Sequence, residues 1–340
     1  MPGPPGSPRA WVEYCTRCGR AWALTDRRWR CACGGLLDLA GPRGDTPSWA
    51  VWGEDPTPVR QVAPGLWLKM EQLLPTGSFK ARGAAAMIGL AAELGESSVV
   101  VDSSGNAGRA VAAYGVRAGL EITVFVPDST DAPKVGAIRD LGATVVEVPG
   151  GRSAAAAAAV EALNPGEAGR PPWYASHVYQ PAFHLGIKGL AFELHDRLPS
   201  LQTVVVPAGN GTLVIGLWLG FRELVAAGRL SRLPRIVAVQ SERCAPLAGL
   251  APAGPTVAVG IAIPAPPRAG AVRAAVLASG GRVLIAAEDD LLPARAGLAA
   301  MGIEVEPTAA AVWAAWRRGR GPVEGGRPDG GDTVLVLTGR

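Results

Sequence analysis

One lysine of this chain stands where an amine could do chemistry. Lys80 lies in the segment TGSFKARG, residues 76–83, where a small flexible turn leads into a helical stretch. A lysine amine forms a Schiff base with an aldehyde cofactor. A helix N-terminus disfavours the protonated amine and so helps to supply the reactive neutral form. On its own this segment is a weak signal, because a lysine in a Gly/Ser turn is more often a solvated surface cation.

A second segment, SSGNAG at residues 103–108, directly follows a run that we predict to be a strand. Its hydroxyls and backbone N–H groups lie at a predicted helix start, where they can hold a carboxylate. Asn106 could instead be a simple N-cap of that helix.

A third segment, PAGNGTL at residues 207–213, also joins a predicted strand to a predicted helix. Glycines let backbone N–H groups approach a phosphate, the Thr212 hydroxyl can donate, and the helix dipole adds favourable charge. The segment lacks the Gly-Lys-Ser/Thr ending of a Walker loop and the GxGxxG pattern of dinucleotide sites. An ordinary glycine-rich turn is the alternative.

The last predicted strand ends in Leu337-Thr338-Gly339. A threonine hydroxyl at a strand end can bind a ring nitrogen without protonating it. Alone, Thr338 is only a residue near the chain terminus.

Four of the five cysteines cluster near the N-terminus, and Cys244 stands apart. Cys15 and Cys18 form a CxxC pair, Cys31 and Cys33 form a CxC pair, and a glycine follows each pair, as in the turns of a zinc ribbon. Four thiolates would give a closed, structural, tetrahedral site. The alternative is a degenerate ribbon without metal, held by a core of Trp22, Trp29 and Leu36.

The elements that must position these residues follow from alternating apolar runs and alanine-rich stretches. Continuous β-branched runs indicate strands that are buried on both faces of a parallel sheet, at Ser98–Asp102, Ile122–Val126, Thr144–Val148, Thr203–Pro207, Ile236–Gln240, Val283–Ala286 and Thr333–Leu337. Helices are predicted at Asn106–Ala118, Pro133–Leu141, Phe183–Arg197, Leu213–Ala227, Asp289–Ala300 and Pro307–Trp316. The alternation predicts an α/β fold, with ligands outside the carboxyl ends of the strands.

The composition narrows the class of protein. The chain of 340 residues is 48% hydrophobic, which is globular, and its net charge of +4 does not predict a nucleic-acid binder. We see no apolar segment near Met1–Pro8 or elsewhere that reads as a secretion signal or membrane span. We therefore expect a cytoplasmic protein with no membrane and no nucleic-acid partner.

Taken together and in this order, GSFKARG, SSGNAG, PAGNGTL, EPTAAA (residues 306–311) and the final LTG resemble the fold type II enzymes of pyridoxal 5′-phosphate (PLP). The resemblance runs from about Trp52 to the C-terminus and is best with the threonine synthases. It implies a two-lobed, tryptophan synthase β-like α/β fold behind an N-terminal zinc-ribbon-like segment. The implied domains are residues 1–40 for that segment, 41–88 with 184–340 for a large PLP-binding lobe, and 89–183 for a small lobe.

The resemblance also implies roles for individual residues. Lys80 would bind the cofactor aldehyde and move the substrate α-proton, and Asn106 would contact the cofactor's phenolic oxygen. Thr338 would face the pyridine nitrogen. The phosphate would be held by Gly209, Asn210, Gly211 and Thr212, and the substrate carboxylate by Ser103, Ser104, Gly105 and Ala107. Lys134 could lie near an anionic substrate, although a surface lysine is the alternative.

The implied activity is that of a PLP-dependent lyase or transferase acting on an amino acid in a homodimer. For a threonine synthase this is γ-elimination of phosphate from phosphohomoserine, followed by β-addition of water. Ala81 stands where the synthases usually carry Asp, and Val259 stands where an acidic residue is common. The sequence also stops at Arg340, soon after Thr338-Gly339, where relatives usually continue. These departures favour, as an alternative, β-replacement or ammonia elimination on another amino acid in specialised metabolism. A non-catalytic PLP-fold binding subunit is a further alternative.

Overall fold

The computed structural model describes residues 11–42, 47–50, 55–164, 169–318 and 331–340. The chain divides into two compact units, one of residues 1–54 with 80–186 and one of residues 55–79 with 187–340. The lobe boundaries expected from the sequence differ from this division and stay a prediction. Met1–Pro8 lies outside the described residues, as does part of the connector at 41–58.

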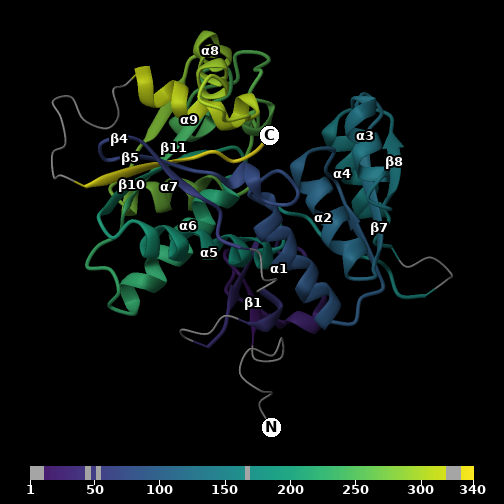
Figure 1. The fold of residues 1–340 in the computed structure, drawn as a ribbon. Helices are drawn as coiled ribbons and strands as arrows, with labels where there is room; N and C mark the ends of the chain where they lie inside the picture. Colours follow the sequence, from purple (N-terminus) through teal and green to yellow (C-terminus); the bar gives the residue numbers. More distant parts are fainter. Residues whose placement is uncertain (1–10, 43–46, 51–54, 165–168, 319–330) are drawn as a thin grey trace. The chain divides into compact units, whose positions relative to one another are not determined.

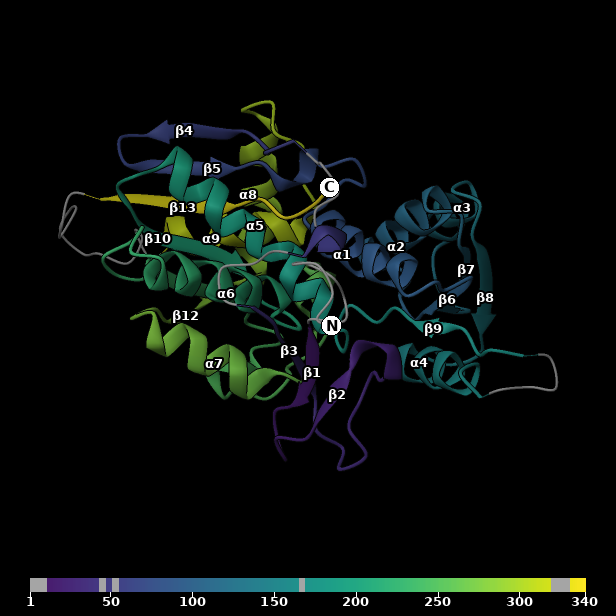
Figure 2. The ribbon, with the colours of Figure 1, turned by 90° about the horizontal axis from the view of Figure 1, so that it is seen from below.

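The first unit is built on a sheet whose four strands are all parallel, in the order β8-β7-β6-β9. Figure 2 shows helices α2 and α3 on one side of this sheet and α4 on the other. The strands β6, β7 and β8 and the helices α2 and α3 confirm the predicted order of elements. The bounds are β6 Ser98–Val101, β7 Glu121–Pro127, β8 Thr144–Val148, β9 Trp173–Tyr174, α2 Asn106–Arg117, α3 Ala132–Arg139 and α4 Arg152–Glu161.

The N-terminal part of this unit is a small antiparallel sheet in the order β2-β1-β3, with β1 at Val12–Cys15, β2 at Ala21–Ala23 and β3 at Leu37–Ala40. Its core consists of Cys15, Cys31 and Leu37, with Trp22 packed beside it. The predicted ribbon core of Trp22, Trp29 and Leu36 is wrong in two members. Leu37 rather than Leu36 points inward, and Trp29 packs against two tyrosines from elsewhere in the unit.

The second unit is built on a six-stranded sheet in the order β12-β11-β10-β13-β5-β4. All neighbours are parallel except β4, which runs antiparallel to β5 at the edge. Figure 1 shows α8 and α9 on one face of this sheet and α6 and α7 on the other. The bounds are β4 Val59–Ala63, β5 Leu66–Lys69, β10 Leu201–Pro207, β11 Arg235–Ser241, β12 Val283–Ala286, β13 Asp332–Val336, α6 Thr212–Ala226, α7 Ala269–Ala278, α8 Glu288–Ala299 and α9 Pro307–Arg318.

Strand β5, which ends in the charged Lys69, is absent from the strands predicted from the sequence. Lys69 is fully buried, and its ammonium donates to the Thr57 carbonyl at 2.7 Å and to the Glu193 carboxylate at 2.6 Å. A buried charge needs such partners. The ion pair therefore lets a lysine stand in a strand that is otherwise apolar.

Two further helices complete the chain, α1 at Lys80–Glu93 and α5 at Pro181–Arg197. Glycines let α1 pack closely within the first unit: a Cβ at Gly83 would lie 2.6 Å from the ring of Phe183, inside contact distance. In the described part of the chain no helix is both long enough and apolar enough to cross a membrane.

Candidate active site

Lys80 is the first residue of α1, as the Gly/Ser turn before it predicted. The turn closes with Gly77, at φ 76°, donating its N–H to the Leu74 carbonyl at 2.7 Å. Phe79, which precedes Lys80 in the chain, donates its N–H to the Thr338 carbonyl at 3.0 Å, and Ser78 forms a bridge with Gly339. The backbone just before Lys80 is therefore fixed to the end of the chain.

The positive charge of Lys80 affects the pKa of a buried histidine in the same unit, His177. Burial, and next the positive charge of Lys80, lower the pKa of His177 to about 3. The imidazole is therefore neutral at physiological pH, and it lies edge-on to Phe183 at 5.8 Å between ring centroids. A neutral imidazole beside Lys80 adds no second positive charge to the surroundings of the amine.

The loop of residues 103–107 joins β6 to α2. The N-cap of α2 is Gly105 and not Asn106, and no side chain caps this helix end. Ser103 Oγ accepts the N–H of Gly105 at 3.4 Å, which turns the loop back onto the helix. A Cβ at Gly108 would overlap the Ser103 carbonyl oxygen, so only glycine allows this turn. The arrangement leaves an uncapped helix N-terminus of the kind that binds a carboxylate.

In the second unit, the loop of residues 209–212 joins β10 to α6. Its two glycines have no room for a side chain: a Cβ at Gly209 would lie 2.6 Å from the Gly260 carbonyl oxygen, and one at Gly211 would overlap Val272. Gly211 is the N-cap of α6 at φ 80°, again with no capping side chain. Thr212 is buried at the first helical position. A backbone cradle at the N-terminus of a 15-residue helix suits a phosphate.

Thr338 lies beside this loop because of strand order. β13 is the parallel neighbour of β10, so the carboxyl ends of both strands lie at the same edge of the sheet. The Thr338 side chain is 3% exposed, and among the described residues its Oγ1 has no hydrogen-bond partner. A buried hydroxyl without a partner is costly. The cradle and this hydroxyl fit a group with a phosphate and a ring nitrogen.

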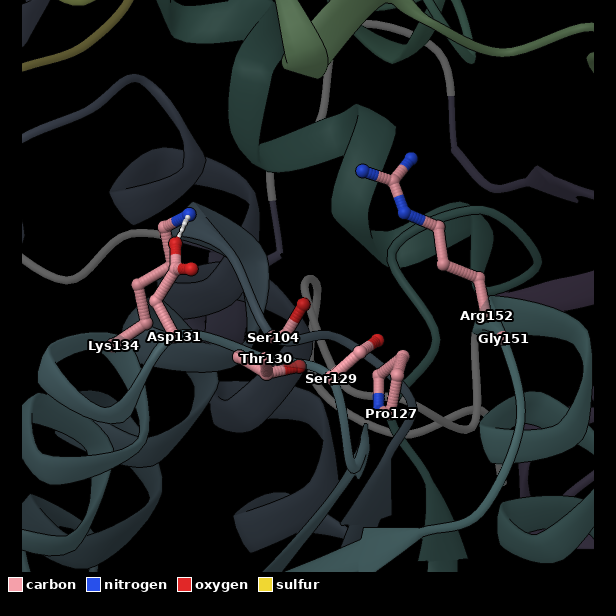
Figure 3. A pocket seen from close by; sticks show the side chains of 8 residues that line it. All are labelled: Ser104, Pro127, Ser129, Thr130, Asp131, Lys134, Gly151 and Arg152. Atoms are coloured by element: carbon pink, nitrogen blue, oxygen red, sulfur yellow. Dashed lines mark hydrogen bonds and ion pairs between the residues drawn. The ribbon is translucent and has the colours of Figure 1, made fainter.

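A hollow of about 280 Å³ lies next to the 103–107 loop. Figure 3 shows the hydroxyls of Ser104, Ser129 and Thr130 between Lys134 on one side and Arg152 on the other. Lys134 is exposed and pairs with Asp131 at 2.6 Å, which lowers the pKa of that carboxyl. Among the described residues no carboxylate pairs with Arg152. Hydroxyls with an unpaired guanidinium are the groups that bind an anion such as a phosphate.

Arg152, Ser129 and Thr130 were not singled out from the sequence. Ser129 and Thr130 follow β7, the parallel neighbour of β6, so the carboxyl-end rule could have placed them beside Ser104. Arg152 follows two glycines at the start of an alanine-rich stretch, which is a weaker signal. Lys134, for which the sequence left two interpretations, both lines the hollow and is exposed.

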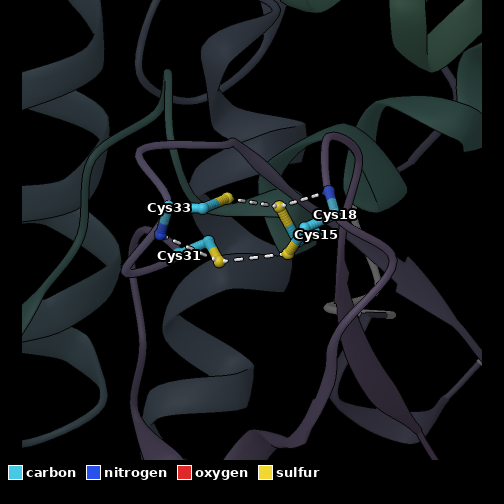
Figure 4. A group of neighbouring side chains, drawn as sticks. All are labelled: Cys15, Cys18, Cys31 and Cys33. Atoms are coloured by element: carbon cyan, nitrogen blue, oxygen red, sulfur yellow. Dashed lines mark hydrogen bonds between the residues drawn. The ribbon is translucent and has the colours of Figure 1, made fainter.

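The four N-terminal cysteines come together as one group. Their Sγ atoms all lie within 4.8 Å of one another, with Cys15 3.5 Å from Cys33 and Cys18 3.6 Å from Cys31. Figure 4 shows the four thiols facing a common centre. Burial alone would raise the pKa of the Cys15 thiol, but the backbone N–H groups of Cys18 and Arg17 bring it down to about 6. Such a group could hold a metal ion.

The chain is similar in sequence to known proteins. Residues 52–339 match the family described as pyridoxal-phosphate dependent enzyme. A threonine synthase of Methanosarcina acetivorans is 32% identical over 267 residues, which cover 74% of this chain and 65% of that protein. The L-serine dehydratase/L-threonine deaminase of Mus musculus is 35% identical over 161 residues, covering 47% of this chain and 48% of that protein.

The fold is similar to that of solved structures. A fungal L-serine ammonia-lyase from Rhizomucor miehei superimposes with a TM-score of 0.70 at 22% identity, covering 84% of this chain and 94% of the other. At this identity the similarity concerns the fold alone.

Proposed function

The chain belongs to the family of pyridoxal-phosphate dependent enzymes, and from that premise we propose that it is a threonine synthase-like lyase. Its substrate would be an amino acid that carries an anionic group at its far end, most simply phosphohomoserine. The reaction would be γ-elimination of phosphate, followed by β-addition of water. The observation that carries this proposal is the hydroxyl and cation hollow, because Ser104 belongs both to it and to the 103–107 loop.

The residues of this chain fit the cofactor that the family uses. Gly209, Asn210, Gly211 and Thr212 would hold its phosphate, and Thr338 would take its ring nitrogen, which accounts for a hydroxyl that otherwise lacks a partner. Lys80 would bind the aldehyde. Bound PLP supplies an electron sink that makes the substrate α-proton acidic. Because Thr338 is neutral and does not protonate the ring, that sink is modest and suits elimination and replacement at the β or γ carbon.

The remaining steps belong to side chains and backbone groups of the chain itself. The Lys80 amine would accept the α-proton and later return a proton, with Asn106 on the phenolic oxygen. Ser103, Ser104, Gly105 and Ala107 would hold the α-carboxylate at the uncapped start of α2. The anionic leaving group would then lie in the hollow, where Arg152 and Lys134 stabilise the charge that builds up as the C–O bond breaks.

A matched set of variants tests this assignment. Removing one charge-assisted hydrogen bond costs about 1.5–3 kcal/mol, or roughly 10- to 150-fold in kcat/KM. We therefore expect Arg152→Ala and Lys134→Ala to lower kcat/KM for phosphohomoserine by such a factor. The control is Arg139→Ala in α3, whose cation pairs with Glu147 and does not line the hollow. Phosphate release and threonine formation are the measurements. If wild-type protein forms no threonine from phosphohomoserine, the proposed synthase activity is refuted.

Ammonia elimination from serine or threonine is the second candidate. The similarity to the mouse dehydratase favours it, as do Ala81 and Val259 at positions where the synthases usually carry acidic residues. Assaying the protein with phosphohomoserine and with serine or threonine distinguishes the two functions, because only the dehydratase reaction releases ammonia and a 2-oxo acid. Arg152→Ala should leave that reaction unchanged, since its substrates carry no distal anion.

We further propose that the cysteine group binds structural zinc. A tetrahedral ion with Zn–S bonds of about 2.3 Å needs sulfurs about 3.8 Å apart, close to the separations seen here. A homodimer stays a prediction from the family resemblance, and a cytoplasmic location stays a prediction from the sequence.

A further inference from the structure

The turn that carries Trp29 is anchored to the body of the first unit by a buried ion pair. Arg27 stands at φ 56° and donates two bonds to the Glu96 carboxylate, at 2.7 and 2.8 Å, and one to the Pro171 carbonyl at 2.7 Å. The Glu96 side chain is 2% exposed. A non-glycine residue in the left-handed region is held there by its surroundings. The position of Trp29, two residues later, is therefore fixed.

Trp29 meets two tyrosines edge-on. The ring centroids lie 5.3 Å from Tyr174 and 5.2 Å from Tyr179, at interplanar angles of 88° and 72°. Tyr174 itself is 3% exposed and stands in β9, where it pairs with Val100 of β6. Edge-on contacts of this kind favour one orientation of the rings.

The hydroxyl of Tyr174 donates to Asp102 Oδ1 at 2.8 Å. Asp102 is the residue between β6 and the 103–107 loop, and burial raises the pKa of its carboxyl. A carboxylate a few residues before an uncapped helix start is a natural cap for the N–H groups there. Yet α2 has no side-chain cap, and the Asp102 carboxylate bonds to Tyr174.

We propose that Trp29 and Tyr174 are positioning residues for substrate binding. They hold the Asp102 carboxylate away from the start of α2, so that the loop N–H groups stay available to the substrate carboxylate. Without the Tyr174 hydroxyl, Asp102 competes with the substrate for these groups. This inference rests on the proposed role of the 103–107 loop, and it gives the N-terminal segment a part in substrate affinity.

Two tyrosine variants of the PLP-loaded enzyme form a matched pair. Tyr174→Phe keeps the ring against Trp29 and removes the bond to Asp102, whereas Tyr179→Phe keeps its ring contact and removes a different hydroxyl. We expect Tyr174→Phe to raise KM for the amino-acid substrate about tenfold with kcat within about twofold, and Tyr179→Phe to change neither. Adding Asp102→Asn to Tyr174→Phe should restore most of the lost affinity, because an amide does not compete as an anion.

A readout without turnover separates this inference from the proposed function. Hydrogen exchange of the loaded protein should show slower exchange at residues 103–107 in Tyr174→Phe than in wild type, since the competing carboxylate now bonds these N–H groups. Trp29→Leu should also slow hydrogen exchange at residues 103–107. Equal exchange in all variants, or a Tyr174→Phe defect that Asp102→Asn does not relieve, would overturn the positioning role. Altered exchange in a protein that turns over no amino acid would overturn the proposed function alone.

Discussion

Gly108 offers a direct test of the substrate loop, through the change Gly108→Ala. The new Cβ would overlap the Ser103 carbonyl oxygen and lie 2.9 Å from its carbonyl carbon. Both atoms belong to backbone, so no side chain can turn aside. The loop must move by more than about 1 Å before ordinary contact distances return. A displacement of that size at a binding site can cost about 100-fold in rate, or about 2.7 kcal/mol.

The expected result is a kcat/KM about 100-fold below that of wild type, with little loss of stability. Replacing a glycine inside a helix by alanine favours the helix by up to about 1 kcal/mol, which offsets part of the strain. The control is Gly136→Ala in α3, where a Cβ meets nothing within 4 Å. Steady-state kinetics and thermal unfolding of both variants give the comparison. Wild-type kinetics in Gly108→Ala would refute the assignment of this loop to the substrate.

Three further predictions concern other parts of the chain. Burial, and next the charge of Asp26, raise the pKa of Glu13 to about 8. The folded state therefore holds a proton that the unfolded state loses above pH 4.5, and the stability of the folded state falls as the pH rises from 4.5 to 8. Glu13→Gln should remove this loss of stability, which reaches about 4 kcal/mol at pH 8. Proteolysis of residues 11–40 at pH 5 and pH 8 measures the effect, and the same pH dependence in wild type and variant would count against the raised pKa. Gly35→Ala should expel the metal, because a Cβ there would overlap the Cys15 sulfur; elemental analysis should find one zinc per wild-type chain and little in the variant, and equal contents would argue against the site. Gly211→Ala should weaken PLP binding about 5- to 30-fold by equilibrium titration, since φ 80° costs an L-residue about 1–2 kcal/mol; an unchanged affinity would exclude the 209–212 cradle.

The sequence predicted those elements whose signals are local. Buried parallel strands such as β6 and β10 are continuous apolar runs, and the turns that follow them carry the glycines and hydroxyls of the two loops. Parallel pairing then brings Thr338 to the same sheet edge as the 209–212 loop. These relations follow from period, turn chemistry and strand order, all of which can be read in one chain.

What the sequence did not reveal depends on pairs that lie far apart in it. Tyr174 bonds to Asp102 across 72 residues, and the buried Lys69 of β5 pairs with Glu193 across 124 residues. Trp29 was expected in the core of a metal-free ribbon, but its ring packs edge-on against two tyrosines. Tertiary contacts of this kind override local pattern and composition.

In the proposed enzyme, Lys80 carries the cofactor, and this assignment can be measured directly. The measurement is the visible absorption of the purified protein, before and after borohydride reduction, with mass spectrometry to locate the reduced adduct. We predict an absorption band that borohydride removes and a pyridoxyl adduct on Lys80, both absent from Lys80→Ala. An adduct on another lysine, or a protein that stays colourless after incubation with PLP, would contradict it.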